Sequence, residues 1–323
     1  MGARNAVAAA VGLAFVLLPQ AVLAQATFPV RQITIVVPTA AGSTADGAAR
    51  TVANELSLIT RQPVVVDNRP GAGGTLAAMY AAKAAPDGHT IMLGTNSTHA
   101  ANVSLFKNLP YDPIRDFAPI TLAESAPAFL VVTPDSPLQS VDDLRRIARA
   151  KQGDVSVGVF SVSGIVAAAM LKGKGGFEFV QIPYKAPSPA ITDLLGGRLD
   201  AMVADVQNTV SLAQGQKIRI LAVSSRARFP VLPDIPTMIE AGIPDYDMVS
   251  WGAYFAPRDT PPDVVAALNR LLHAAYATEP VRATSARFGM QIRLSTPAEL
   301  ADFLRVEIPK WTEMIRASGY EQQ

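Results

Sequence analysis

A strand, a loop of small residues and a helix follow one another near the N-terminus, and this succession most constrains the fold. Residues 33–37 form an apolar run rich in β-branched side chains, which predicts a buried strand. Pro38 ends the run, small residues occupy 39–43, and apolar residues then recur with helical spacing between 49 and 56. Such a unit places backbone N–H groups and the positive end of a helix dipole at the sheet edge where α/β proteins bind anions. We therefore expect this segment to form half of a ligand site.

The composition is that of a folded chain long enough for two domains. The 323 residues can bury two sizeable cores, since 49% are hydrophobic and only 17% are charged. A net charge of +1 offers no overall attraction to nucleic acid or to an anionic membrane. The absence of cysteine excludes disulfides, thiolate nucleophiles and zinc–thiolate sites.

Residues 1–24 have the features of a secretory signal peptide. Arg4 and the terminal amine are positive, and the apolar run at 6–18 is shorter than the roughly 20 residues that span a bilayer. Small residues at Val22, Ala24 and Ala26 then fit the requirement of signal peptidase. We expect cleavage and export of a soluble protein to the periplasm, and an uncleaved anchor is the alternative.

Strand and helix patterns alternate in two series, separated by proline-rich segments at 108–117 and 226–244. Such alternation through short loops is typical of βαβ units and predicts a mainly parallel sheet flanked by helices in each series. We therefore predict an α/β fold with two lobes. One lobe comprises residues 27–124 plus 248–323, so that the C-terminal helices complete it, and the other comprises residues 125–247.

Patterns typical of enzymes and cofactor sites are incomplete. The loop 71–76 follows a strand and opens a helix, but Leu76 stands where a dinucleotide-binding loop needs Gly or Ala. Ser161 and Ser163 lack the flanking glycines of a hydrolase elbow, so a helix N-cap explains them better. The histidines lack metal-ligand spacing, and no paired carboxylates suggest acid–base catalysis. We predict a protein without metal or cofactor that is not an enzyme.

Loops rich in hydrogen-bond donors follow the predicted strands. They lie at 39–46, 94–99, 160–164, 184–187 and around Asp205. N–H and O–H groups aimed inward from several loops hold a small polar anion without reacting with it. Lys185 places a cation among them, and a solvated surface lysine is the alternative reading. His99 lies in a loop of hydroxyl and amide side chains, so we expect it to line the cleft.

Long motifs, in order, resemble those of a known receptor family. The chain resembles the periplasmic solute receptors of tripartite tricarboxylate transporters, also called Bug receptors, over essentially all of its mature length. The matching segments are residues 36–46, 63–74, 84–88, 94–100, 109–117 and 183–185, Trp251, and residues 255–257 and 260–261.

The resemblance implies a type II-like periplasmic binding protein of the Venus-flytrap kind. It would close on a small organic acid, amino acid or amide and deliver it to a membrane permease; we expect a monomer that binds no nucleic acid. Ligand carboxylates would be held by backbone amides and waters at the loops after the first and third strands, with further contacts from the second lobe. The residues predicted to bind the ligand are Thr39, Ala40, Ala41, Gly42, Ser43, Asp46, Thr95, Asn96, Ser97, Thr98, His99, Ser161, Ser163, Gly164, Tyr184, Lys185, Asp205 and Trp251.

Three departures from the family pattern leave the ligand open. The usual Pro-Gly-Gly of the first loop is residues 41–43 (Ala-Gly-Ser), a frequent His-Leu pair is replaced by residues 167–168 (Ala-Ala), and Tyr-Lys-Gly becomes residues 184–186 (Tyr-Lys-Ala). Asp46 either offsets the helix dipole or receives an ammonium or amide group of the ligand. A ligand sensor for a membrane sensor kinase and an exported serine hydrolase are the alternative functions.

Overall fold

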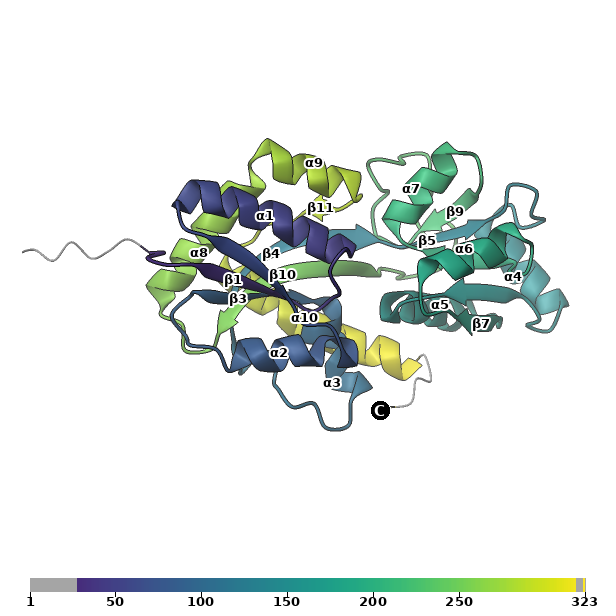
Figure 1. Ribbon diagram of the computed structural model, residues 1–323. Coiled ribbons are helices and arrows are strands. Elements are labelled where there is room, and N and C mark those ends of the chain that lie inside the picture. Colours follow the sequence, from purple (N-terminus) through teal and green to yellow (C-terminus); the bar gives the residue numbers. More distant parts are fainter. Residues whose placement is uncertain (1–27, 318–321, 323) are drawn as a thin grey trace, which may run out of the picture.

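The computed structural model describes residues 28–317 and residue 322. This part of the chain forms two α/β lobes that lie side by side (Figure 1). We call the lobe built on the six-stranded sheet lobe 1 and the lobe built on the five-stranded sheet lobe 2. The predicted signal peptide lies outside the described residues. Within them, every helix is too short or too polar to cross a membrane.

The sheet of lobe 1 has the strand order β11-β4-β10-β3-β1-β2. The first strand, β1, pairs in parallel with β2 and β3, whereas β10 runs antiparallel to β3 and β4, and β11 antiparallel to β4. Its strands are β1 (Ile33–Val37), β2 (Val64–Asn68), β3 (Thr90–Thr95), β4 (Phe117–Pro127), β10 (Val249–Pro257) and β11 (Gln291–Ile292).

Helices cover both faces of this sheet (Figure 1). Successive side chains of a strand point to opposite faces, so Ile35 packs with the apolar stripe of α1 while Val36 packs with the alanines of α2. This explains why β1 is apolar throughout. The helices of lobe 1 are α1 (Thr44–Thr60), η1 (Ala72–Gly74), α2 (Thr75–Ala82), the π-helical turn η2 (Ser97–Ala101), α3 (Asn102–Leu105), α8 (Pro262–Tyr276), α9 (Glu279–Arg287) and α10 (Pro297–Ala317).

The sheet of lobe 2 has the strand order β7-β6-β8-β5-β9. Its middle strand, β8, pairs in parallel with β6 and antiparallel with β5, and β6 is parallel to β7. The strands are β5 (Phe129–Val132), β6 (Ser156–Val159), β7 (Val180–Pro183), β8 (Ala201–Ala204) and β9 (Arg219–Val223). The helices are α4 (Val141–Ala150), α5 (Val162–Gly175), α6 (Pro187–Leu195) and α7 (Val206–Gln214).

The two-lobed α/β architecture is confirmed, but the sheets are mixed and not mainly parallel. The antiparallel pairs involve the strands next to the crossings between the lobes, which are β4 and β10 in lobe 1 and β5 in lobe 2. A strand that carries the chain out of a lobe and one that brings it back run in opposite directions. The βαβ pattern predicted the parallel pairs and contained no information about these crossings.

Ser224 joins the two crossings. Its backbone N–H donates to the Ala128 carbonyl at 2.9 Å, and its Oγ accepts the Ala128 N–H at 2.8 Å. The same hydroxyl donates to the Met248 carbonyl, and the Met248 N–H donates to the Ser224 carbonyl at 3.0 Å. Ser224 is 1% exposed. One buried serine therefore holds the outgoing and the returning chain together where the lobes meet.

Candidate functional site

A cavity of about 650 Å³, which we call the outer cavity, lies between the lobes. Lobe 1 contributes the start of α1 and the segment after α9, and lobe 2 contributes the loops after β6 and β8 and the loop before α6. Both crossings border it. Its lining residues are Thr39, Ser43, Thr44, Ala45, Ala126, Pro127, Ala128, Phe160, Ser161, Ser163, Gly164, Lys185, Val203, Ala204, Asp205, Val206, Ser250, Phe288 and Met290.

Three helices begin at this cavity, and the capping residue of each lines it. In α1 the Ser43 side chain accepts the Asp46 N–H at 3.2 Å, and in α5 the Ser161 side chain accepts the Gly164 N–H at 3.1 Å. In α7 the Asp205 side chain accepts the Asn208 N–H at 2.9 Å. The positive ends of three helix dipoles, one from lobe 1 and two from lobe 2, therefore meet at one cavity.

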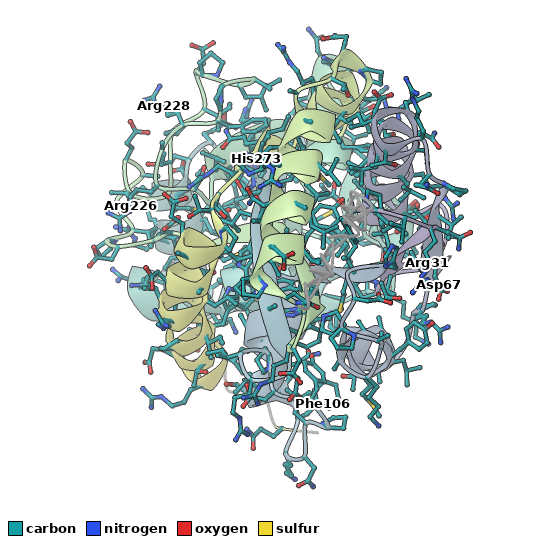
Figure 2. The ribbon with its side chains drawn as sticks, turned by 90° about the vertical axis from the view of Figure 1, so that its left-hand side faces the viewer. Arg31, Asp67, Phe106, Arg226, Arg228 and His273 are labelled. Carbon is teal, nitrogen blue, oxygen red and sulfur yellow. The ribbon has the colours of Figure 1, made fainter. Side chains whose placement is uncertain are left out.

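The charged side chains on the outer cavity are Lys185 and Asp205 among the described residues. Lys185 is exposed, whereas Asp205 is half-buried at the start of α7. Burial raises the pKa of Asp205, and the hydrogen bonds from Asn208 oppose that shift only in part. Arg31, Arg226 and Arg228 are exposed and lie at the margins of the molecule in Figure 2. The cavity thus combines one cation with oriented dipoles, and its acid is shifted toward the neutral form.

A smaller cavity of about 210 Å³, the inner cavity, extends into lobe 1. It shares five lining residues with the outer cavity, so the two spaces adjoin. Most of its exposed wall is apolar. The shared residues are Thr44, Ala45, Ala126, Ser250 and Met290; the others are Ala48, Leu93, Thr95, Asn96, Ala123, Glu124, Ser125, Trp251 and Gly252.

Ser163 of α5 connects the lobes beside these cavities. The Asn96 amide of lobe 1 donates to its Oγ at 3.1 Å, and the hydroxyl of Ser250 on β10 lies 3.1 Å from the same oxygen. On the other side, Gly289 of lobe 1 lies so close to Val206 of lobe 2 that a Cβ on Gly289 would lie 1.9 Å from Val206 Cγ1. The lobes therefore touch directly around the cavity.

The structure brings many of the predicted site residues together. Thr39, Ser43, Ser161, Ser163, Gly164, Lys185 and Asp205 line the outer cavity, and Thr95, Asn96 and Trp251 line the inner one. The Trp251 indole N–H is already donated to Glu307 at 2.9 Å, and its ring packs against Phe303 of α10 with centroids 5.3 Å apart.

The first loop faces the cavities less than predicted. Ala40, Ala41 and Gly42 are exposed, and none of them lines either cavity. The Gly42 N–H donates to Asp46 Oδ2 at 2.8 Å, and the Ser43 N–H donates to the Ala40 carbonyl at 3.2 Å. These two N–H groups, which we expected to bind the ligand, form hydrogen bonds within the loop itself.

Asp46 belongs to the helix cap and lines neither cavity. It is 3% exposed, accepts the Gly42 N–H and pairs with Arg50, whose Nη2 lies 2.9 Å from Oδ1. Burial alone would raise its pKa, but the hydrogen bonds from Arg50, Gly42 and Asn68 outweigh burial and lower it. The geometry therefore favours the dipole and capping explanation.

The loop after β3 turns its histidine into the core. His99 is 0% exposed and stacks on Phe255 with ring centroids 3.8 Å apart, and its Nδ1 lies 2.9 Å from Thr98 Oγ1. Burial lowers the pKa of His99 to about 3, so it is neutral. Thr98 is also 0% exposed, and Ser97 lines neither cavity. The expectation that His99 lines the cleft is wrong, because the π-helical turn points it at the sheet.

Tyr184 is held away from the cavities as well. Its hydroxyl donates to Asp193 Oδ2 at 2.6 Å, and Arg198 Nη2 binds the other oxygen of the same carboxylate. The hydrogen bond to Asp193 is the main cause that raises the pKa of Tyr184. The tyrosine therefore braces α6, while its neighbour Lys185 lines the outer cavity.

Several lining residues were missed because they stand outside the predicted loops. Glu124, Ser125 and Ala126 lie on β4, and Ser250 lies on β10. Phe288 and Met290 follow α9. The proline-rich crossings were the only sequence signal that the strands on either side of them reach the cleft.

Hydrolytic and metal chemistry find no support in the geometry. Ser161 Oγ caps α5 and Ser163 Oγ is bonded to Asn96 and Ser250, and within residues 28–317 neither has a hydrogen bond to a histidine. The described residues also hold no cluster of three or more His, Asp or Glu suited to a metal. The arrangement is a cavity lined by oriented hydrogen-bond donors.

A two-lobed α/β fold with a donor-lined cavity between the lobes is typical of a binding protein. The sequence model of the tripartite tricarboxylate transporter family receptors matches residues 48–320. The chain belongs to this receptor family.

Similar proteins support that assignment. BugT of Bordetella pertussis is 33% identical over 299 residues, which cover 91% of each chain. The structure of the R. palustris protein Rpa4515 with adipate matches with a TM-score of 0.79 and 34% identity, covering 90% of this chain and 98% of that one. MatC from Rhodopseudomonas palustris with bound malate matches with a TM-score of 0.74 and 33% identity, covering 89% and 100%.

Proposed function

We propose that this protein is a periplasmic receptor that captures a small organic acid in the outer cavity and delivers it to the permease of a tripartite tricarboxylate-type transporter. The ligand carboxylate would lie between the helix starts of the two lobes, near Ser43, Ser161 and Lys185. Thr39, Ser163, Gly164 and Asp205 would complete the contacts of the outer cavity, and Thr95, Asn96 and Trp251 those of the inner one.

The convergence of three helix N-termini with Lys185 carries this proposal. Helix starts present N–H groups that lack intrahelical partners, and their dipoles favour an anion. Because α1 belongs to lobe 1 and α5 and α7 belong to lobe 2, an anion placed between them binds both lobes at once. A ligand that contacts both lobes stabilises the closed arrangement over an open one. The adipate and malate bound to two similar receptors support a carboxylate as the ligand.

We further propose that residues 27–124 plus 248–323 move as one body and residues 125–247 as the other. The crossings held by Ser224 would form the hinge, since the chain passes from one sheet to the other there. In this view the closed form is what the permease recognises. Pull-down from membranes with the ligand-loaded protein should recover a permease; recovery of a sensor kinase in its place would point to sensing.

Calorimetric titration tests the binding step. The mature protein should bind at least one member of a panel of small mono- and dicarboxylates, and binding should weaken as salt is raised. Lys185→Met should reduce affinity about tenfold, because a charge-assisted contact is lost. Lys174→Met, which removes an exposed lysine at the far end of α5, is the matched control and should change affinity by less than about twofold.

Two results would overturn the proposal. One is that the mature protein binds none of the carboxylates in the panel. The other is a Lys185→Met variant with the affinity and salt dependence of the parent protein, which would place the anion elsewhere.

A further inference from the structure

The inner cavity has room for a part of the ligand that the outer cavity does not hold. At about 210 Å³ it is well above the roughly 30 Å³ that one water occupies in the liquid. It opens onto the outer cavity beside the start of α1, so a molecule anchored there by its carboxylate can extend inward. Ala48, Leu93 and Met290 give it apolar walls. Such a space suits an uncharged part of a ligand.

Glu124 stands in this wall and is 8% exposed. It is the only titratable residue among the described residues that line the inner cavity. No cation lines the cavity beside it within the same set. Its observed partner is Ser285 of α9, whose hydroxyl contacts Oε1. A carboxyl group placed in an apolar wall, away from cations, is an unusual feature that folding alone does not require.

The hydrogen bonds of Ser285 indicate the protonation state of Glu124. Ser285 Oγ lies against Glu124 Oε1 and also 3.0 Å from the Val281 carbonyl. A hydroxyl has one proton, so it can donate fully to only one of these two oxygens. Both contacts are satisfied when the Glu124 carboxyl carries a proton and donates to Ser285, while Ser285 donates to Val281. Burial also raises the pKa of Glu124, which favours the same neutral form.

We propose that the inner cavity is a second ligand subsite, in which Glu124 as a neutral carboxylic acid hydrogen-bonds an uncharged polar group at the end of the ligand opposite its carboxylate. Because the Glu124 proton is donated to Ser285, the second carboxyl oxygen accepts, and the ligand class is therefore an organic acid with a distal amide or hydroxyl. This inference rests on the proposed function, because the carboxylate has to occupy the outer cavity.

The chemistry of the subsite sets the order of preference. A distal amide or hydroxyl matches the polar atoms of Glu124. A distal methyl leaves those atoms without a partner, which costs binding energy. A distal carboxylate loses its hydration in an apolar space whose lining residues, among those described, include no cation. We expect the monoamide of a dicarboxylic acid to bind at least about tenfold more tightly than either the diacid or the plain monocarboxylate of equal length.

Titration with matched ligands tests this. The set comprises succinate, glutarate and adipate, their monoamides, and butyrate, pentanoate and hexanoate. Glu124→Leu should reduce the preference for the monoamide over the monocarboxylate to less than about threefold. Glu124→Gln keeps a neutral polar group of the same size and should retain the order of affinities. This second variant keeps the test decisive if the Leu variant fails to fold. Circular dichroism verifies that each variant is folded.

The outcomes separate this inference from the proposed function. The subsite alone is overturned if carboxylate binding depends on Lys185 but Glu124→Leu leaves the preference for the monoamide over the monocarboxylate unchanged. An affinity for the diacids that rises more than about tenfold in Glu124→Gln shows that Glu124 is charged and also overturns it. Failure to bind any of the acids overturns both proposals.

Discussion

Asp46→Asn separates a capping role from a binding role. The substitution keeps the size of the side chain but removes its charge at the start of α1. The amide oxygen of the variant side chain can still accept one N–H, so the shape of the loop is preserved. What is lost is the charge in three contacts: the Gly42 N–H at 2.8 Å, the Arg50 pair at 2.9 Å, and the favourable position at the helix N-terminus.

The magnitude follows from these contacts. A hydrogen bond to a charged group is worth about 1 kcal/mol more than one to a neutral group. The Arg50 side chain is 50% exposed, so its pair adds at most about 1 kcal/mol, and the dipole adds roughly 0.5 kcal/mol. We expect the free energy of unfolding to fall by about 2 kcal/mol at neutral pH. Ligand affinity should stay the same, because Asp46 lines neither cavity.

The pH dependence supplies a second test. The pKa of Asp46 is lowered below its usual 3.8 in the folded protein, so its stabilisation is present above that value and disappears as pH falls through the lowered pKa. The difference between parent and variant should therefore shrink toward zero in acid. Urea unfolding followed by the fluorescence of Trp251 and Trp311, both buried in lobe 1, measures it.

A matched control uses another acidic residue paired with arginine on a helix. Asp302 pairs with Arg305 on α10, and their side chains are 72% and 69% exposed. Asp302→Asn should hardly change stability, because an exposed pair contributes little. The capping argument is refuted if Asp46→Asn leaves stability unchanged while ligand affinity falls, since Asp46 would then act on the ligand.

Two further predictions concern the hinge and closure. Ser224→Ala should lower the free energy of unfolding by about 1–3 kcal/mol, because it leaves the Ala128 N–H and the Met248 carbonyl unpaired in the interior. Urea unfolding measures this change, and Ser225→Ala, at a partly exposed position, is the control. Equal stability of the two variants would contradict the hinge role of Ser224. Gly289→Ala should weaken ligand binding about tenfold or more in calorimetry, because its Cβ would collide with Val206 and hold the lobes apart. Gly197→Ala is its control, with φ +71° and open space around the added Cβ; equal affinities would show that the Gly289–Val206 contact does not limit closure.

Local patterns in the sequence determined much of the fold. Apolar β-branched runs and small-residue loops predicted β1, β3, β6 and β8 and the helices that follow β1 and β6, because strand and helix periodicity depend only on neighbouring residues. For the same reason Ser161 was recognised from sequence as a helix cap, whereas the capping role of Ser43 was not predicted. Their convergence does not follow from local patterns, because β1 and β6 belong to different sheets, whose relative placement depends on how the lobes pack.

Only the tertiary structure decided which side chains face the cavity. The π-helical turn sends His99 onto Phe255, and the Asp193 carboxylate holds Tyr184 aside; neither partner is a neighbour in sequence. Glu124 reaches the inner cavity because β4 lies between β10 and β11 in the sheet and against α9, which no local pattern encodes. Helix and strand starts are properties of short segments, whereas the direction of a side chain in a cavity depends on packing between distant ones. The sequence by itself therefore predicted donor-rich loops in two lobes, and packing decided which residues line the cavity between them.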